Sequence, residues 1–181
     1  MTRLLIVFTL ICIVTVANGQ NFKNTEVSIS AGYMFEDAVL YFHEINQERY
    51  VGDTFLLKAD ASYFPNSFSK RFGFGAYYAF SEPFYAFYDV VTMHEFGLAF
   101  KAKFSASRMI MIVPTVYVGY RSYDGEAGEG LGLNFSTIFQ FPMKNITPFV
   151  DVGFMTQPAG GNDESDITYS PVFIIGGGIT F

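Results

Sequence analysis

The chain has 181 residues, of which 50% are hydrophobic, 19% aromatic and only 15% charged. That length suits one domain, and 22 Phe with 12 Tyr carry too much apolar surface for a disordered chain. The formal net charge of -6 argues against general binding to nucleic acid, which requires a basic surface. A single Cys excludes both an internal disulfide and a thiolate metal cluster.

The first element in the chain is an apolar run, Leu4–Ala17, which follows the single positive charge of Arg3. The run is shorter than the roughly 20 residues that a membrane-spanning helix requires. Small residues then occupy the positions expected of a cleavage site after Gly19. We therefore expect residues 1–19 to be a secretory signal peptide.

Apolar and polar residues alternate with a period of two along the rest of the chain, which predicts β-strands with one apolar face. Eight such segments follow one another: 26–35, 53–64, 70–80, 92–104, 109–121, 129–141, 146–156 and 168–181. In the second segment, Phe55 and Leu57 share one face, whereas Lys58 and Asp60 share the other. A soluble sandwich has the same alternation, so other features must decide between a sandwich and a membrane barrel.

Aromatic placement is the first of these features, because Phe and Tyr gather at the ends of the apolar faces. The residues concerned are Tyr33, Phe35, Tyr63, Phe72, Phe80, Phe104, Tyr120, Phe141, Phe154 and Phe181. Girdles of this kind are typical of transmembrane β-barrels at the two membrane interfaces.

Loop length and charge are the second feature, because long and short connections alternate. The long ones are 36–52, 81–91, 122–128 and 157–167, and the short ones are 65–69, 105–108 and 142–145. Most acidic residues lie in the long loops and at their edges, opposed only by Arg49 and Arg121. Four bases and no acid lie on the short-turn side: Lys23, Lys70, Arg108 and Lys144. Outer-membrane barrels have short periplasmic turns and long outer loops, so we expect both termini to be periplasmic.

Eight charged residues remain on the polar strand faces, four acidic and four basic: Glu26, Lys58, Asp60, Arg71, Glu95, Lys101, Lys103 and Asp151. The lumen of an eight-stranded barrel is only wide enough for side chains to fill it, and an unpaired buried charge there costs several kcal/mol. The balance predicts a closed lumen with paired charges, without saying which residues pair. The predicted fold is all-β, an eight-stranded antiparallel transmembrane β-barrel over residues 20–181.

The strand number, the loop alternation and the C-terminal segment together resemble the small outer-membrane β-barrels of the OmpA-transmembrane-domain and OmpX-like kind, often described as porin family proteins. The C-terminal segment resembles the strand signal that the outer-membrane assembly machinery reads, through Phe173, Ile175, Ile179 and Phe181. Ile174 departs from that signal, which usually has a polar residue there. The resemblance implies an integral protein of the bacterial outer membrane, with lipid, lipopolysaccharide and the assembly machinery as its partners and no cofactor.

Some small barrels modify lipid A, so His94 is considered as a candidate catalytic residue. It lies on the lipid-facing side of segment 92–104, but Phe96 stands where lipid A deacylases have a Ser. Histidine without its partner residues is more often structural, so we predict no enzyme activity. Lipid A modification and a small pore stay as weaker hypotheses.

Aromatic residues in the first two long loops are candidates for surface contacts: Tyr41, Phe42, Phe84, Tyr85, Phe87 and Tyr88. They either form a binding surface or pack on each other over the barrel mouth. The acidic stretch 162–166 lacks the spacing of an EF-hand, so no metal site is predicted. The predicted function is structural or surface-binding, and the alternative is an accessory subunit of a larger outer-membrane complex.

Overall fold

The structure is a computed structural model. It describes the backbone of residues 24–35, 38–42, 47–51, 54–68, 70–86, 89–123, 129–161 and 167–181. Side chains are described for residues 24–34, 55–67, 70–81, 92–123, 129–161 and 171–181. The predicted signal peptide, residues 1–19, lies outside these ranges. Within them, no helix is long and apolar enough to cross a membrane.

Strands make up almost all of the described chain, and the only helix described is the short 3-10 helix η1, Asn66–Phe68. The strands are β1 (Thr25–Phe35), β2 (Ala38–Phe42), β3 (Gln47–Val51), β4 (Thr54–Tyr63), β5 (Phe72–Ala86), β6 (Asp89–Ala102), β7 (Phe104–Ser105), β8 (Met111–Tyr123), β9 (Glu129–Gln140), β10 (Thr147–Gly161) and β11 (Ile167–Thr180).

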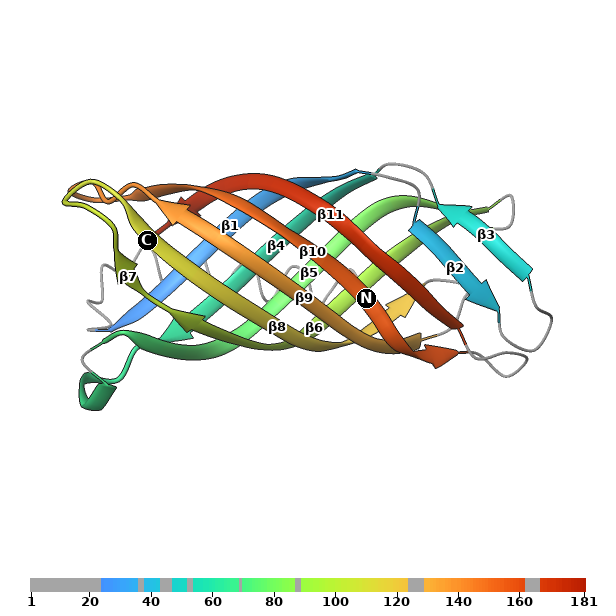
Figure 1. The fold of residues 1–181 in the computed structure, drawn as a ribbon, viewed down its shortest axis with the longest axis horizontal. Coiled ribbons are helices and arrows are strands. Elements are labelled where there is room, and N and C mark those ends of the chain that lie inside the picture. Colours follow the sequence, from blue (N-terminus) through green and yellow to red (C-terminus); the bar gives the residue numbers. More distant parts are fainter. Residues whose placement is uncertain are drawn as a thin grey trace, which may run out of the picture.

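The sheet closes into a barrel of eight antiparallel strands. The order around the barrel is β1, β4, β5, β6, β8, β9, β10 and β11, and β11 then pairs with β1 (Figure 1). Closure leaves no unpaired edge among these eight strands, which is how a sheet satisfies its backbone hydrogen bonds within a membrane. The predicted fold class is confirmed.

The remaining three strands extend the barrel at its ends. β7 pairs with β8 where β6 ends, and β2 and β3 form a hairpin that pairs with β11 at the opposite end (Figure 1). The prediction that 36–52 is a loop missed this hairpin. The expected loop 81–91 is also mostly strand, because β5 continues to Ala86 after a register shift between Ser81 and Phe84. Such a shift interrupts the period of two on which the prediction depended.

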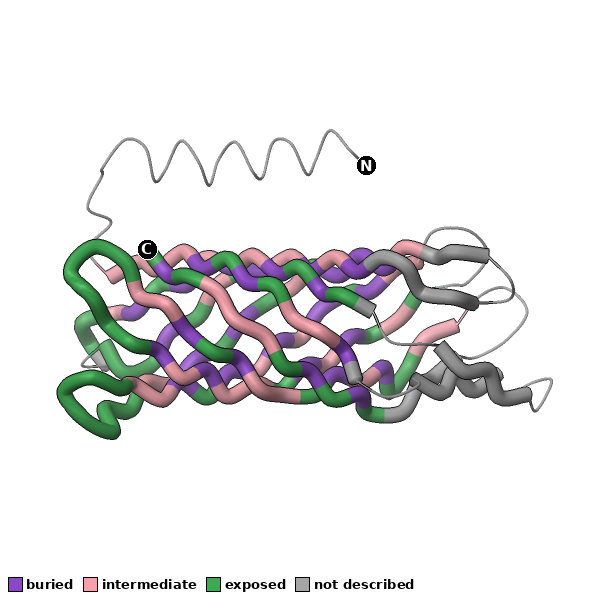
Figure 2. Tube along the Cα trace, turned by 90° about the horizontal axis from the view of Figure 1, so that it is seen from above, coloured by how far each residue is buried: buried purple, intermediate pink, exposed green. Residues whose placement is uncertain are grey.

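Side chains alternate between the lumen and the outer wall along every barrel strand, so that buried and exposed residues follow one another (Figure 2). Large hydrophobic side chains are exposed on all eight: Ile29, Phe55, Leu57, Phe74, Phe96, Leu98, Phe100, Tyr120, Phe135, Val150, Phe154 and Ile175. Phe55, for example, is 62% exposed. A continuous apolar wall of this kind is stable against lipid and unfavourable against water.

Candidate functional site

Four ion pairs lie in the described part of the lumen; three of them reach across intervening strands, and Glu95–Arg121 joins the neighbouring strands β6 and β8. The pairs are Glu26–Lys103, Asp60–Lys101, Lys58–Asp151 and Glu95–Arg121. The structure thus places seven of the eight charges predicted for the lumen in ion pairs inside it. The remaining residue in these pairs is Arg121, which takes the place predicted for Arg71.

The prediction is wrong for Arg71, which is exposed at the residue before β5 begins. It is also wrong for Arg121, which the sequence analysis assigned to a loop edge. β8 continues two residues past the predicted end at position 121, so Arg121 lies within the barrel directly opposite Glu95 on β6. The charge balance of four acids and four bases is unchanged by this exchange.

The most buried of these pairs is Glu95–Arg121, and both side chains are 0% exposed. Arg121 Nε donates to Glu95 Oε2 at 2.6 Å, while the amide of Asn134 and the hydroxyl of Tyr77 donate to Oε1. Arg121 Nη1 also donates to the carbonyl oxygen of Thr156 at 3.3 Å. A buried carboxylate with several donors is satisfied on both oxygens, which offsets the cost of removing it from water.

Glycine makes room for this cluster at Gly132, which faces the lumen on β9. A Cβ built there would lie 2.2 Å from Glu95 Oε2. Gly119 on β8 does the same for Tyr77, whose hydroxyl would be 2.5 Å from the added Cβ. Gly132 and Gly119 are therefore positions into which the polar cluster projects.

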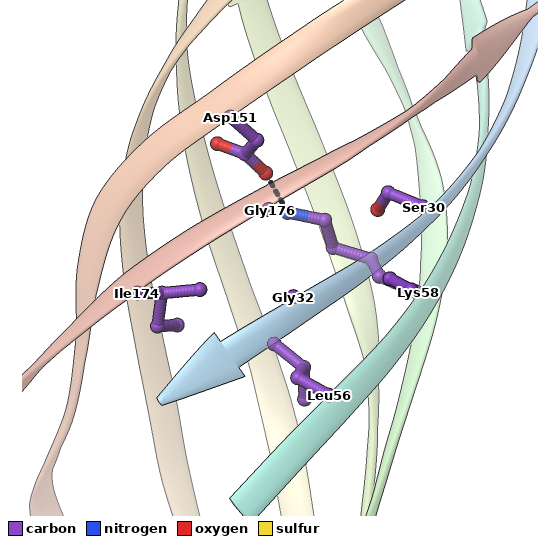
Figure 3. Close-up of a pocket in the computed structure, with 8 residues that line it drawn as sticks. Ser30, Gly32, Leu56, Lys58, Asp151, Ile174 and Gly176 are labelled. Atoms are coloured by element: carbon purple, nitrogen blue, oxygen red, sulfur yellow. Dashed lines mark hydrogen bonds and ion pairs between the residues drawn. The ribbon is translucent and has the colours of Figure 1, made fainter. Parts of the chain in front are cut away.

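The Lys58–Asp151 pair connects β4 to β10 across the two strands between them (Figure 3). Lys58 Nζ donates to Asp151 Oδ2 at 2.8 Å and lies 4.3 Å from the centre of the Tyr117 ring. The Lys58 side chain extends from β4 past β1 toward Gly176 on β11 and meets Asp151 there. A lumen cavity of about 10 Å³ lies beside this pair, and that is close to the space one water molecule needs.

Phe64 lies at the short-turn end of the lumen. Its buried ring lies over Gly73, where an added Cβ would be 2.5 Å from a ring carbon. Lys103 Nζ is 3.8 Å from the ring centre and also pairs with Glu26. A lysine over an aromatic ring is stabilised by the cation–π interaction, so the ring and the ion pair pack together at this end.

Apolar side chains fill the space between the ion pairs. Toward the long-loop end the buried cluster includes Met34, Leu56, Met93, Met155, Val172 and Ile174. Toward the short turns it consists of Val113, Ile138 and Phe149. The described part of the lumen is therefore filled with packed side chains.

The position of Ile174 in the barrel accounts for its departure from the assembly signal. Its side chain points into the lumen and packs in the cluster with Met34 and Leu56, so an apolar residue fits where a polar one is usual. The four residues predicted as that signal, Phe173, Ile175, Ile179 and Phe181, are exposed on the outer wall or at the strand end.

His94 lies on the outward-facing side of β6, opposite Phe80 on one neighbouring strand and Ser122 on the other. The Tyr78 hydroxyl is 2.6 Å from His94 Nδ1, and the Phe80 ring centre is 5.4 Å from that of His94. Only 8% of the residue is exposed. The ring is thus held between aromatic neighbours and offers little access to a substrate.

The side chains of the predicted loop contacts lie outside the described residues. The backbone of Tyr41 and Phe42 belongs to β2, and that of Phe84 and Tyr85 belongs to β5. Their side chains, the whole of Phe87 and Tyr88 and the acidic stretch 162–166 lie outside the described residues. In the described part of the chain, no three His, Cys, Asp or Glu residues gather closely enough to hold a metal ion.

Known proteins resemble this chain in structure and not in sequence. No family model and no curated protein sequence matches it. The crystal structure of Neisserial surface protein A matches with a TM-score of 0.61 and 11% identity, over 87% of this chain and 96% of that protein. Outer membrane protein OprG from Pseudomonas aeruginosa matches with a TM-score of 0.55 and 11% identity, over 87% and 96%. Similarity at this identity shows the fold, which is that of the small outer-membrane β-barrels.

Proposed function

We propose that the chain is an integral protein of the bacterial outer membrane with a closed lumen, and that it acts as a structural or surface-binding protein. The observation that carries this proposal is the filled interior: four ion pairs and two apolar clusters lie inside a wall of exposed hydrophobic residues. Such an interior supplies rigidity and no path for solutes. Function then belongs to the long-loop end, where β2 and β3 add a hairpin.

The location is tested by purifying the protein in detergent and comparing boiled with unboiled samples on a gel. A closed barrel resists unfolding by detergent until it is heated, so the two samples are expected to migrate differently. Identical migration together with a helical circular dichroism spectrum would overturn the barrel. Protease added to intact cells tests the orientation, because only the long-loop end is expected to be cleaved.

The closed lumen is tested by conductance in planar bilayers. We expect no stable channel steps from the wild-type protein, because the ion pairs and Phe64 occupy the lumen. Stable steps of uniform size would contradict the proposal and favour a pore.

The enzyme hypothesis is tested by the mass spectrum of lipid A from cells that overproduce the protein. An unchanged spectrum is expected, since Tyr78 and Phe80 enclose His94. A new lipid A species that disappears in His94→Ala would overturn the non-enzymatic assignment.

Membership of a larger complex is the alternative to a stand-alone role. Affinity purification from native outer membranes in mild detergent, followed by mass spectrometry, separates the two. Recovery of the chain alone supports the stand-alone barrel, whereas a second outer-membrane protein in stoichiometric amount makes this chain an accessory subunit.

A further inference from the structure

Two turns at the short-turn end of the barrel, residues 105–110 and 141–146, carry exposed apolar side chains. Met109 is 76% exposed and Met143 is 62% exposed, and Ile110 beside Met109 is exposed as well. An apolar patch on a protein surface marks a place where the surface meets a membrane or another apolar partner.

The sheet places these two turns side by side. The first turn leads into β8 and the second follows β9, and Met111 on β8 pairs with Gln140 on β9 (Figure 1). The residues just outside this pair therefore belong to the two turns. Their exposed apolar side chains form one surface.

Hydrogen bonds hold both turns in shape. Ser107 Oγ accepts the backbone N–H groups of Met109 and Ile110, both at 3.1 Å. In the second turn, the N–H of Met143 donates to the carbonyl oxygen of Ile146 at 3.1 Å. The apolar side chains are thus presented outward by folded turns.

Positive charge accompanies these apolar side chains. Arg108 directly precedes Met109, Lys144 directly follows Met143, and both bases are exposed. Neither makes an ion pair among the described residues, and the sequence of the two turns contains no acid. We refer to Arg108, Met109, Ile110, Met143 and Lys144 as the turn patch. A cation beside an apolar side chain is the arrangement found in segments that lie at a membrane surface.

The turn patch continues the apolar outer wall of the barrel. Phe104 directly precedes the first turn, Phe141 begins the second, and both are exposed. Aromatic residues at strand ends are typical of the membrane interface. The patch lies next to this aromatic border, so the apolar surface that is continuous with it is the membrane.

We infer that the turn patch binds anionic phospholipids at the membrane surface, with its apolar side chains among the acyl chains and its two bases paired with lipid phosphates. This inference rests on the proposed membrane location. Two unpaired bases without an acid favour an anionic headgroup over a zwitterionic one. The guanidinium of Arg108 can bind phosphate oxygens through two parallel hydrogen bonds, while Lys144 acts as a point charge.

The chain contains no Trp, so fluorescent reporters can be introduced one at a time. Met109→Trp and Met143→Trp report on the turn patch, and Phe100→Trp reports on the outer wall. Asn66→Trp is the matched control, because Asn66 and the adjacent Ser67 are exposed polar residues in the turn between β4 and β5, at the same end. All four positions are exposed, so each variant is expected to fold.

Each variant is folded into phosphatidylcholine vesicles that contain phosphatidylglycerol or phosphatidylcholine with brominated acyl chains, which quench Trp on contact. We expect the wall reporter Phe100→Trp to be quenched equally by both lipids. The patch reporters Met109→Trp and Met143→Trp should also be quenched, whereas Asn66→Trp should not.

The lipid preference of the patch tests the role of its bases. At Met109→Trp, brominated phosphatidylglycerol should bind about fivefold more tightly than brominated phosphatidylcholine, the effect of one cation near an anionic lipid. Adding Arg108→Gln should remove this preference. Adding Lys70→Gln, at an exposed base of the turn between β4 and β5, should leave it unchanged.

Three outcomes would overturn the inference while leaving the membrane location intact. Equal quenching of the patch reporters by both lipids would show that the bases do not select the headgroup. Unquenched patch reporters, beside a quenched Phe100→Trp, would show that the turns face water or a protein. Quenching of Asn66→Trp with the same preference would show that the patch is not distinct from the rest of this end. An unquenched Phe100→Trp would instead contradict the membrane location and thus the proposed function itself.

Discussion

The ion pairs at the two ends of the lumen differ in burial and in the number of their partners. Glu95 and Arg121 are both 0% exposed, whereas the side chains of Glu26 and Lys103 are 25% and 15% exposed. Both oxygens of Glu95 accept hydrogen bonds, but Glu26 Oε2 has no partner among the described residues. The comparison teaches that equal charge balance hides unequal energetic weight, because a partly exposed ion pair is screened by solvent and a fully buried one is not.

Arg121→Met should have the largest effect on stability, because it leaves Glu95 buried without its counter-charge. Breaking a buried ion pair by removing one partner costs about 3–5 kcal/mol. The expected result is a loss of that size in the free energy of unfolding, measured by urea titration of the barrel in lipid vesicles.

The double variant Arg121→Met/Glu95→Leu is the control for this prediction. It removes both charges and leaves no unpaired carboxylate, so much of the lost stability should return. A double variant less stable than Arg121→Met alone would show that Glu95 contributes chiefly through Tyr77 and Asn134.

Lys58→Ala should have the next largest effect, a loss of about 3 kcal/mol in the free energy of unfolding. This is the lower end of the range for breaking a buried ion pair. The cavity beside Asp151 is large enough to admit about one water molecule, which would partly solvate the remaining carboxylate. Lys144→Ala, the same substitution at an exposed turn residue, should change stability by less than about 0.5 kcal/mol. Equal effects of the two substitutions would contradict a structural role for the Lys58–Asp151 pair.

The fold and most of the lumen could be predicted from the sequence because a period of two determines which side of a strand each residue faces. Lys58 and Asp60, for example, follow from alternation with Phe55 and Leu57 alone. The sequence could not predict that Lys58 pairs with Asp151, since that depends on the tilt of β4 and β10 across two intervening strands.

Strand ends were the main source of error. Arg71 and Arg121 both lie at an end of a predicted segment, and one or two residues of strand decide whether an end residue is inside the barrel. A useful signal was nevertheless present, because Arg121 continues the inward alternation of Tyr117 and Gly119.

Phe64→Ala should destabilise the barrel by less than the roughly 3–5 kcal/mol typical of a buried Phe, because solvent can enter the space at the barrel end. Its clearer effect is access to the lumen. Ser62 precedes Phe64 on the inward face and is fully buried. Since the chain's single Cys lies in the predicted signal peptide, Ser62→Cys provides one site for a water-soluble maleimide. Labelling is expected only when Phe64→Ala is also present, and equal labelling with Phe64 intact would show that the ring does not close this end.

Glu26→Gln should have the smallest effect on the free energy of unfolding, below about 1 kcal/mol, because its pair with Lys103 is partly exposed and is therefore screened by solvent. The same exposure predicts that added salt weakens the pair, so the difference between Glu26→Gln and wild type should shrink as ionic strength rises. The difference between Arg121→Met and wild type should stay nearly constant, since salt does not reach a fully buried pair. Urea titrations at low and high salt measure both differences. A salt-dependent difference for Arg121→Met would mean that the long-loop end of the lumen is open to water.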